Sequence, residues 1–198
     1  MNYVITIGRQ LGSGGKQIGE ILSQRLHIPC YDKELIQLAS RESGLGKEFF
    51  EKMDEKSSYS FFGNFFSFRS GYVGDSNYLC NETLFKIQSD VIKELAEKES
   101  CIFVGRCADY ILRDYPRRLS VFVCARKEDR IDRIRLAQNI SEKDAAALIE
   151  QADKKRADYY NYYSNKVWGM AASYDLCVDS SVFGMDKIVS IIEDYVRE

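Results

Sequence analysis

The chain has 198 residues, of which 45% are hydrophobic and 13% aromatic, and its formal net charge is -2. This length fits one domain, and this composition excludes disorder of the chain as a whole. Because 28 basic residues nearly balance 30 acidic ones, a general binder of nucleic acid or of a membrane surface is not expected. No apolar run approaches the length of a membrane-spanning helix, so no such segment is expected.

The cysteines and the single histidine indicate a reduced protein rather than a metalloprotein. Six cysteines are scattered without a CxxC pair, several of them inside apolar runs such as CIFVG (101–105). Buried thiols are therefore favoured over disulfides or zinc ligands. With His27 alone, neither a His-rich metal site nor a Ser-His-Asp triad is expected. The N-terminus lacks the charged start and long apolar core of a signal peptide, so we expect a cytoplasmic protein.

Short apolar runs alternate with segments of helical period. NYVITIG (2–8) is a β-branched run that ends at a glycine, and KQIGEILSQRL (16–26) follows with its apolar residues on one helical face. Further strands are predicted over 28–32, 101–105, 119–125 and 174–180. Further helices are predicted over 33–43 and at about 80–98, 106–114, 126–137, 141–163 and 184–197. This alternation indicates a parallel sheet covered on both faces, with ligands bound at the carboxyl ends of the strands.

The segment 57–78 interrupts this alternation. It is rich in Phe, Ser and Gly, and only Arg69 and Asp75 in it are charged. One interpretation is an excursion over the sheet edge that is mobile or buried by a partner. The other is a substrate-side lid or a dimer contact, since an exposed phenylalanine cluster favours association. A homodimer through this insert is therefore one expectation.

A glycine-rich stretch, GRQLGSGGKQIG (8–19), directly follows the first predicted strand. Glycines between a strand and a helix let several backbone N–H groups point at one ligand, and the helix dipole adds positive potential there. The order of strand, glycine loop, lysine and amphipathic helix predicts a phosphate cradle, here for ATP. The residues expected at the nucleotide are Arg9, Gly12, Ser13, Gly14, Gly15, Lys16 and Gln17.

The loop departs from the GxxxxGK[ST] motif, and two alignments stay open. With Gly15-Lys16 on the GK of the motif, Lys16 keeps the usual role of the lysine, but the first glycine becomes Gln10. With the GSG of residues 12–14 on the GSG of many phosphate-binding loops, Gly15 takes the place of the lysine and Arg9 that of the first glycine. We favour the second alignment, because it keeps the apolar spacing of the following helix.

Magnesium normally accompanies ATP, and the motif supplies it with a Ser or Thr hydroxyl. Gln17 stands in place of this hydroxyl residue. We therefore expect magnesium to rely on Ser13, on water and on the nucleotide itself.

Three stretches in this order resemble the cytidylate kinase-like family of P-loop proteins: 8–36, 100–112 (SCIFVGRCADYIL) and 174–181 (YDLCVDSS). The resemblance extends from residue 3 to about 195. It implies a three-layer α/β/α P-loop NTPase fold in one domain, 1–198, with a five-stranded parallel sheet and a helical lid at about 126–170. It also implies a nucleotide kinase that transfers a phosphoryl group from ATP to a nucleoside monophosphate, with CMP or dCMP favoured.

The resemblance also assigns roles on the acceptor side. Asp32 stands where cytidylate kinases hold the aspartate that opens their monophosphate-binding helix, although helix capping alone also favours Asp there. Arg106 matches the arginine of the GRD motif of these kinases, which reaches the monophosphate, and a guanidinium suits that bidentate task. Cys107 replaces the aspartate of the motif, and Asp109 either compensates for it or lies on the helix surface.

Arginines further along the chain are expected to grip the transferred phosphate. In the related kinases the helix after residue 126 leads into the lid, and we favour Arg130 and Arg133 as phosphate contacts over a solvated helix face. The stretch 152–163 resembles the RDxxR-like stretch of cytidylate kinases, with Asp153 at the substrate and Arg156 at the phosphate. Such transfer needs positive charge around the moving group. The predicted catalytic set is Lys16, Arg106, Arg130, Arg133 and Arg156.

Two other functions stay open. The residues at positions 17 and 107 fit a nucleotide-binding or sensing module that has the fold of a kinase without efficient turnover. The unusual insert at 57–78 fits a kinase for another small acceptor, because one scaffold serves many acceptors. All three interpretations have small-molecule nucleotides as partners.

Overall fold

The computed structural model describes residues 2–32, 36, 44 and 75–197. The predicted helix at 33–43, all but residue 36 of it, and residues 57–74 of the insert lie outside the described residues, together with the lid and dimer contacts predicted for that insert. The elements are β1 (Val4–Arg9), α1 (Gly15–Leu26), β2 (Cys30–Tyr31), α5 (Asp75–Lys98), β3 (Cys101–Val104), α6 (Ala108–Ile111), β4 (Arg118–Cys124), α7 (Lys127–Gln138), α8 (Glu142–Ser164), the 3₁₀ helix η1 (Ala171–Ser173), β5 (Leu176–Asp179), α9 (Ser180–Phe183) and α10 (Met185–Arg197).

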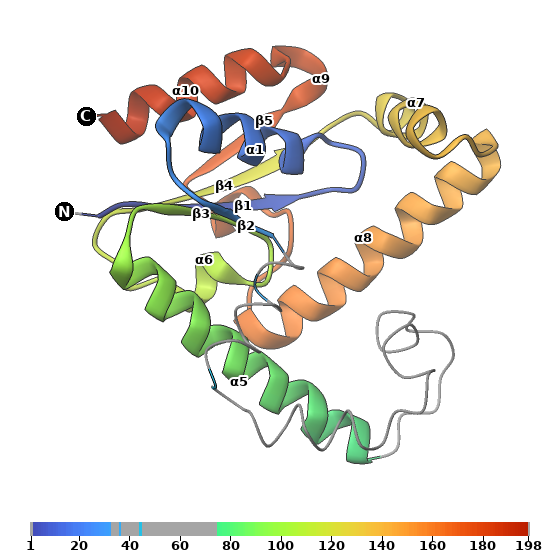
Figure 1. Cartoon of the computed structure of the whole chain (residues 1–198). Coiled ribbons are helices and arrows are strands. Elements are labelled where there is room, and N and C mark those ends of the chain that lie inside the picture. The colour runs from blue at the N-terminus through green and yellow to red at the C-terminus, as the bar shows by residue number, and fades with distance from the viewer. Residues whose placement is uncertain (1, 33–35, 37–43, 45–74, 198) are drawn as a thin grey trace. The chain divides into compact units, whose positions relative to one another are not determined.

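The strands form one parallel sheet of order β2-β3-β1-β4-β5, which confirms the predicted five-stranded parallel sheet. β1 is central and pairs with strands that follow it by about a hundred residues, Val4 lying opposite both Cys101 and Arg118. Because all strands run in the same direction, their carboxyl ends meet at one edge of the sheet (Figure 1). The loop after β1 and the turn after β3 therefore lie side by side.

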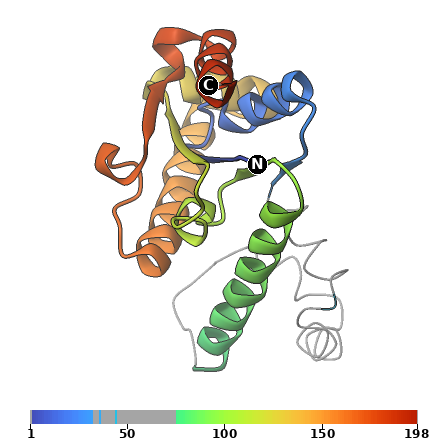
Figure 2. The same ribbon diagram turned by 90° about the vertical axis from the view of Figure 1, so that its left-hand side faces the viewer.

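Helices cover both faces of this sheet. Figure 2 shows α1 and α10 over one face and α6 and α8 on the other. Side chains alternate along β1, so Ile5 and Ile7 pack on the α1 face, against Ile18 and Leu22. All four are less than 2% exposed. Burial of each such side chain stabilises the fold by about 1.5–3 kcal/mol, which fixes α1 on the sheet directly after the glycine loop.

The chain divides into two compact units, one of Met1–Lys33 and Leu95–Glu198, the other of Glu34–Glu94. The whole sheet, α1 and the helices from α6 onward belong to the first unit, and the site described below lies in it. Of the second unit, the structure describes chiefly the part of α5 up to Glu94. Within the described part of the chain, no helix is both long and apolar enough to cross a membrane.

The five strands lie within two residues of their predicted bounds, whereas α6 is shorter than the helix predicted at 106–114. Arg106 and Cys107 have φ of 60° and 55°, in the left-handed region, so a right-handed helix cannot include them. The helix therefore begins at Ala108 and ends after Ile111. Apolar spacing alone carries no signal for this backbone turn.

The region predicted as a lid, about 126–170, contains the helices α7 and α8, which a short turn joins. Asn139 ends α7 in the left-handed conformation, and the Ser141 hydroxyl caps α8 by accepting the Asp144 N–H at 3.1 Å. Ile134 of α7 packs on Ala145 and Ile149 of α8, and Leu11 from the glycine loop packs against this same cluster. The helix pair and the loop thus share a small core.

Candidate functional site

The glycine loop turns from β1 into α1 through two left-handed residues. Gly12 and Gly14 have φ of +78° and +83°, and α1 begins at the next residue, Gly15. A Cβ on Gly12 would also lie 2.8 Å from the backbone carbonyl oxygen of Arg130, so position 12 needs glycine for both conformation and space. Gly14 caps α1 without a side chain, which leaves the first N–H groups of the helix open to an anion.

The loop carbonyls are held from the outside by the elements around them. Arg156 Nη1 donates to the carbonyl of Arg9 at 3.0 Å, and Arg133 Nη1 donates to that of Gly12 at 3.1 Å. Ser180 Oγ donates to the Ser13 carbonyl at 2.7 Å. In a trans peptide the N–H points opposite to the preceding carbonyl, so this last bond turns the N–H of residue 14 toward the concave side of the loop. The loop is thereby preorganised as an anion cradle.

Asp153 of α8 is the centre of this external support. Its Oδ1 accepts the N–H of Leu11 at 2.8 Å, and its Oδ2 accepts Nη1 of Arg130 at 2.6 Å. Arg130 is only 5% exposed, so this ion pair is largely withdrawn from water. Arg156 Nη1 lies 3.9 Å from Oδ1. The structure thus brings the predicted residues Arg130, Arg133, Asp153 and Arg156 together at the loop, in contacts that brace its outer side.

Arg9 occupies the space next to Gly15, which stands at the lysine position of the motif in the favoured alignment. It is on the same face of β1 as Ile5 and Ile7, the face that α1 covers. A Cβ on Gly15 would lie 2.5 Å from Cβ and 3.0 Å from Cγ of Arg9, so a side chain at position 15 would displace the arginine. A Cβ on Gly105, just after β3, would overlap Nη1 of Arg9. Arg9 therefore runs from the start of α1 to the end of β3, along the carboxyl edge of the sheet.

Lys16 is directed away from the loop and toward β2. Its Nζ lies 2.7 Å from Oδ2 of Asp32 and 4.0 Å from Oε1 of Glu20. In the alignment that puts Gly15 at the lysine position, residue 16 stands at the hydroxyl position of the motif. The expectation that Gln17 replaces this hydroxyl therefore holds only for the alternative alignment. The helix start at Gly15 and the packing of Arg9 favour the alignment on residues 12–14.

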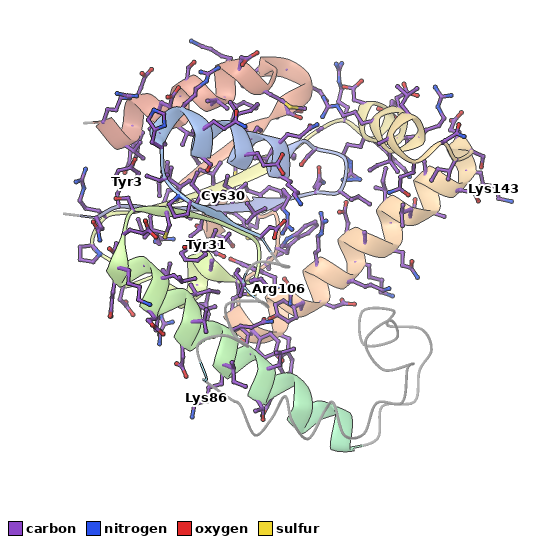
Figure 3. The ribbon with its side chains drawn as sticks, in the orientation of Figure 1. Tyr3, Cys30, Tyr31, Lys86, Arg106 and Lys143 are labelled. Carbon is purple, nitrogen blue, oxygen red and sulfur yellow. The ribbon has the colours of Figure 1, made fainter. Side chains whose placement is uncertain are left out.

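Arg106 follows β3 in a strained turn. Gly105, Arg106 and Cys107 all have positive φ, and two of them carry side chains, a conformation that costs about 1–2 kcal/mol per residue. Figure 3 labels Arg106. Its guanidinium lies 5.4 Å from the ring centroid of Tyr159 on α8. Cys107 is 3% exposed and burial raises its pKa, so its thiol does not replace the carboxylate of the family motif.

Asp109 is buried rather than exposed on the surface of α6, which corrects the surface alternative. It is 7% exposed, and its Oδ2 accepts the hydroxyl of Tyr160 at 2.7 Å. Burial raises the pKa of this carboxyl, with the tyrosine hydrogen bond acting in the opposite direction. The contact joins α6, which follows the Arg106 turn, to α8, which braces the loop.

Two residues of the site were not predicted from the sequence. Gly105 provides the space for the Arg9 guanidinium, and the GR motif that contains it was interpreted through its arginine alone. Ser180 accepts Nη1 of Arg133 at 2.9 Å while donating to Ser13. A serine after a predicted strand carries no signal for such a bridge, because the partners lie more than 40 residues away in sequence.

The side chains near the loop do not fit a magnesium ion ligated by the loop itself. Ser13, the predicted ligand, is fully buried, and its hydroxyl donates to the Gln10 carbonyl at 2.9 Å. Position 16 offers an ammonium in place of a hydroxyl, and the carboxylate of Asp32 is engaged by it. Among the described residues, no cluster of three or more His, Cys, Asp or Glu side chains is placed to hold a metal ion.

A glycine loop after the central strand of a five-stranded parallel sheet, leading directly into a helix, defines a P-loop kinase fold. The chain belongs to the cytidylate kinase-like family, whose model matches residues 4–182. This membership supports phosphoryl transfer to a small substrate. No curated protein gives a sequence match.

Solved structures agree with this fold. The crystal structure of an uncharacterized protein from Eubacterium ventriosum ATCC 27560 has 27% identity and a TM-score of 0.75, over 100% of this chain and 99% of that one. Shikimate kinase from Bacteroides thetaiotaomicron has 14% identity and a TM-score of 0.53, over 99% of each chain. Shikimate kinase from Acinetobacter baumannii, in complex with shikimate, has 13% identity and a TM-score of 0.52, over 100% of this chain and 94% of that one. At these identities the shikimate kinases show the fold alone.

Proposed function

We propose that the protein transfers the γ-phosphoryl group of ATP to a nucleoside monophosphate, with CMP or dCMP favoured by its family. The observation that carries this proposal is the placement of Arg9. Its side chain takes the space beside Gly15, and its guanidinium reaches Gly105, so the loop keeps a cation although it has no lysine at position 15. Phosphoryl transfer depends mainly on positioning and on such charges.

The donor side of the site would consist of the loop and Arg9. ATP phosphates would bind to N–H groups at the start of α1, where the helix dipole is positive and no side chain caps the helix. A guanidinium presents a planar set of donors that suits two phosphate oxygens at once. Arg130, Arg133 and Arg156 would support catalysis by fixing the loop, and a direct contact of Arg133 or Arg156 with the transferred group is part of the proposal.

The acceptor side would lie at the ends of β2 and β3, which are neighbours in the sheet. Asp32 follows β2, and Arg106 follows β3 next to the Arg9 guanidinium. Arg106 would hold the monophosphate, Asp32 would orient the acceptor, and Asp153 would contribute by bracing the loop. Such a reaction uses cytoplasmic nucleotides, in keeping with the cysteines that the structure describes as free thiols.

A coupled ADP-release assay tests this function. ATP with magnesium would be combined in turn with CMP, dCMP, UMP, AMP and shikimate. We expect turnover on CMP or dCMP, and Arg9→Ala should lower kcat/KM about 100-fold or more, as the loss of a preorganised charge at the transferred group does. Arg113→Ala is the matched control, because Arg113 is half exposed beyond α6 and its loss should leave turnover unchanged.

A nucleotide-binding module without turnover is the second candidate. The observation that favours it is Lys16, which stands at the hydroxyl position and pairs with Asp32. Saturable ATP binding without ADP release on any acceptor would support this candidate. If ATP neither binds nor raises the melting temperature, both functions are contradicted.

A further inference from the structure

We propose that the Lys16 ammonium replaces the metal ligand of the phosphate loop, so that ATP binds to this protein without a divalent cation. The inference rests on the proposed function, because it assumes that the loop binds ATP. It concerns one position, the residue that follows Gly15 in the first turn of α1. Other loops of this class place a magnesium-binding hydroxyl there, whereas this chain places a positive charge.

The ammonium is held where it can be exchanged for phosphate. Nζ of Lys16 lies 2.7 Å from Oδ2 of Asp32 and 4.0 Å from Oε1 of Glu20. The lysine side chain is 59% exposed, so water screens the pair and its attraction is weak. The flexible four-carbon stem of a lysine lets the ammonium move to a phosphate oxygen when a nucleotide arrives. Asp32 therefore positions the charge without trapping it.

The same arrangement disfavours a divalent cation. Asp32 is 14% exposed and would be the natural oxygen ligand at the end of β2, but Lys16 already contacts it. A cation approaching this carboxylate would meet the ammonium as a like charge at close range. Ser13 is fully buried, so its hydroxyl oxygen is not exposed to a cation on the nucleotide side. The ammonium of Lys16 thus favours a phosphate over a divalent cation at this position.

Calorimetric titration with ATP tests this inference, with excess magnesium in one buffer and EDTA in the other. We expect the wild-type protein to bind ATP in EDTA with an affinity within about threefold of that in magnesium. Lys16→Met should weaken binding in EDTA at least about tenfold. Lys16→Ser restores the hydroxyl and should make binding depend on magnesium. Lys127→Met removes a comparably exposed lysine at the start of α7 and should change neither affinity.

Asp32→Asn separates this role from a merely structural one. If the carboxylate only holds Lys16 in reserve, its neutralisation removes the 2.7 Å ion pair of the ammonium and strengthens ATP binding in EDTA. A structural ion pair would instead give unchanged or weaker binding together with a lower melting temperature. Melting curves of each variant without nucleotide show whether it is folded.

The outcomes distinguish a failure of this inference from a failure of the proposed function. ATP binding that is at least about tenfold weaker in EDTA, and that Lys16→Met leaves unchanged, overturns the inference while the proposed function stands. Binding in neither buffer contradicts the proposed function, and the inference fails with it.

Discussion

The ion pair between Arg130 and Asp153 gives the sharpest test of how the loop is supported. We predict that Asp153→Asn lowers both the stability of the fold and its affinity for ATP. Asparagine keeps the shape of the side chain, and its carbonyl oxygen can still accept the N–H of Leu11. The NH2 group then takes the place of Oδ2, so the change removes both the charge and the hydrogen-bond acceptor that Arg130 faces at 2.6 Å.

The size of the effect follows from burial. The side chains of Arg130 and Asp153 are 7% and 16% exposed, and Nε of Arg130 is buried without a hydrogen-bond partner among the described residues. Removal of one partner from a buried pair costs about 3–5 kcal/mol, because the other charge stays buried and unpaired. In a chain of this size each kcal/mol lowers the melting temperature by about 2–4 °C, so a decrease on the order of 10 °C is expected.

The same helix pair provides a matched control. Lys127 and Glu150 also join α7 to α8, at 2.8 Å, one turn earlier in each helix, but their side chains are 54% and 68% exposed. Glu150→Gln should therefore leave the melting temperature nearly unchanged. Differential scanning calorimetry of both variants, followed by ATP titration below their melting temperatures, measures the two effects. Equal melting temperatures for the two variants would refute the reasoning from burial.

Three further predictions concern other parts of the first unit. Gly105→Ala should weaken ATP binding more than Gly184→Ala, as paired titrations would show. Both glycines have positive φ, but only at position 105 does the new methyl group displace Arg9. Burial raises the pKa of Asp109 above 3.8, so its contribution to stability is full below that pH and is lost as the pH rises through the raised value. The melting temperature of Asp109→Asn relative to wild type should hence increase from about pH 4 to about pH 8, and a constant difference would count against this argument. Cys177, the exposed thiol among the described cysteines, should be alkylated first by iodoacetamide, which peptide mass mapping would show.

The strands could be predicted because each is an apolar run with its own local signal. Val4 to Ile7 are all buried, and their β-branched residues mark this strand, although it continues through Gly8 to Arg9. The order of strands in the sheet has no such local signal, since β1 pairs with β3 and β4 across long stretches of chain. We therefore predicted a parallel sheet of five strands, but not the order of the strands within it. The turn at Arg106 was missed because a left-handed backbone at a non-glycine residue depends on its surroundings.

The candidate site could be predicted as a set of residues, but not as a set of contacts. Spacing and resemblance selected Arg130, Arg133 and Arg156 as phosphate contacts, and the structure places them at the loop, in contact with a carboxylate and with backbone carbonyls. An arginine binds a carboxylate, a carbonyl or a phosphate according to which of these groups lie beside it in the folded protein. The sequence does not show these neighbours. Arg130 is buried beside Asp153, which makes their pairing the stable arrangement. Lys16 contacts Asp32 because β2 ends beside the start of α1, a proximity created by the sheet.

The residues at positions 9 and 15, where the loop departs from its motif, depend on each other physically. A side chain at position 15 and an arginine at position 9 exclude each other, because a Cβ on Gly15 would lie 2.5 Å from Cβ of Arg9. An arginine at position 9 also requires Gly105, whose Cβ would occupy the place of its guanidinium. Gly15 therefore carries no cation, and an arginine at the end of β1 occupies the space beside it. There Arg9 is still paired with Val123 of β4, whereas the pairing of β1 with β3 ends at Ile7, so the guanidinium starts from a strand that is hydrogen-bonded on one side and reaches the space beyond the end of β3.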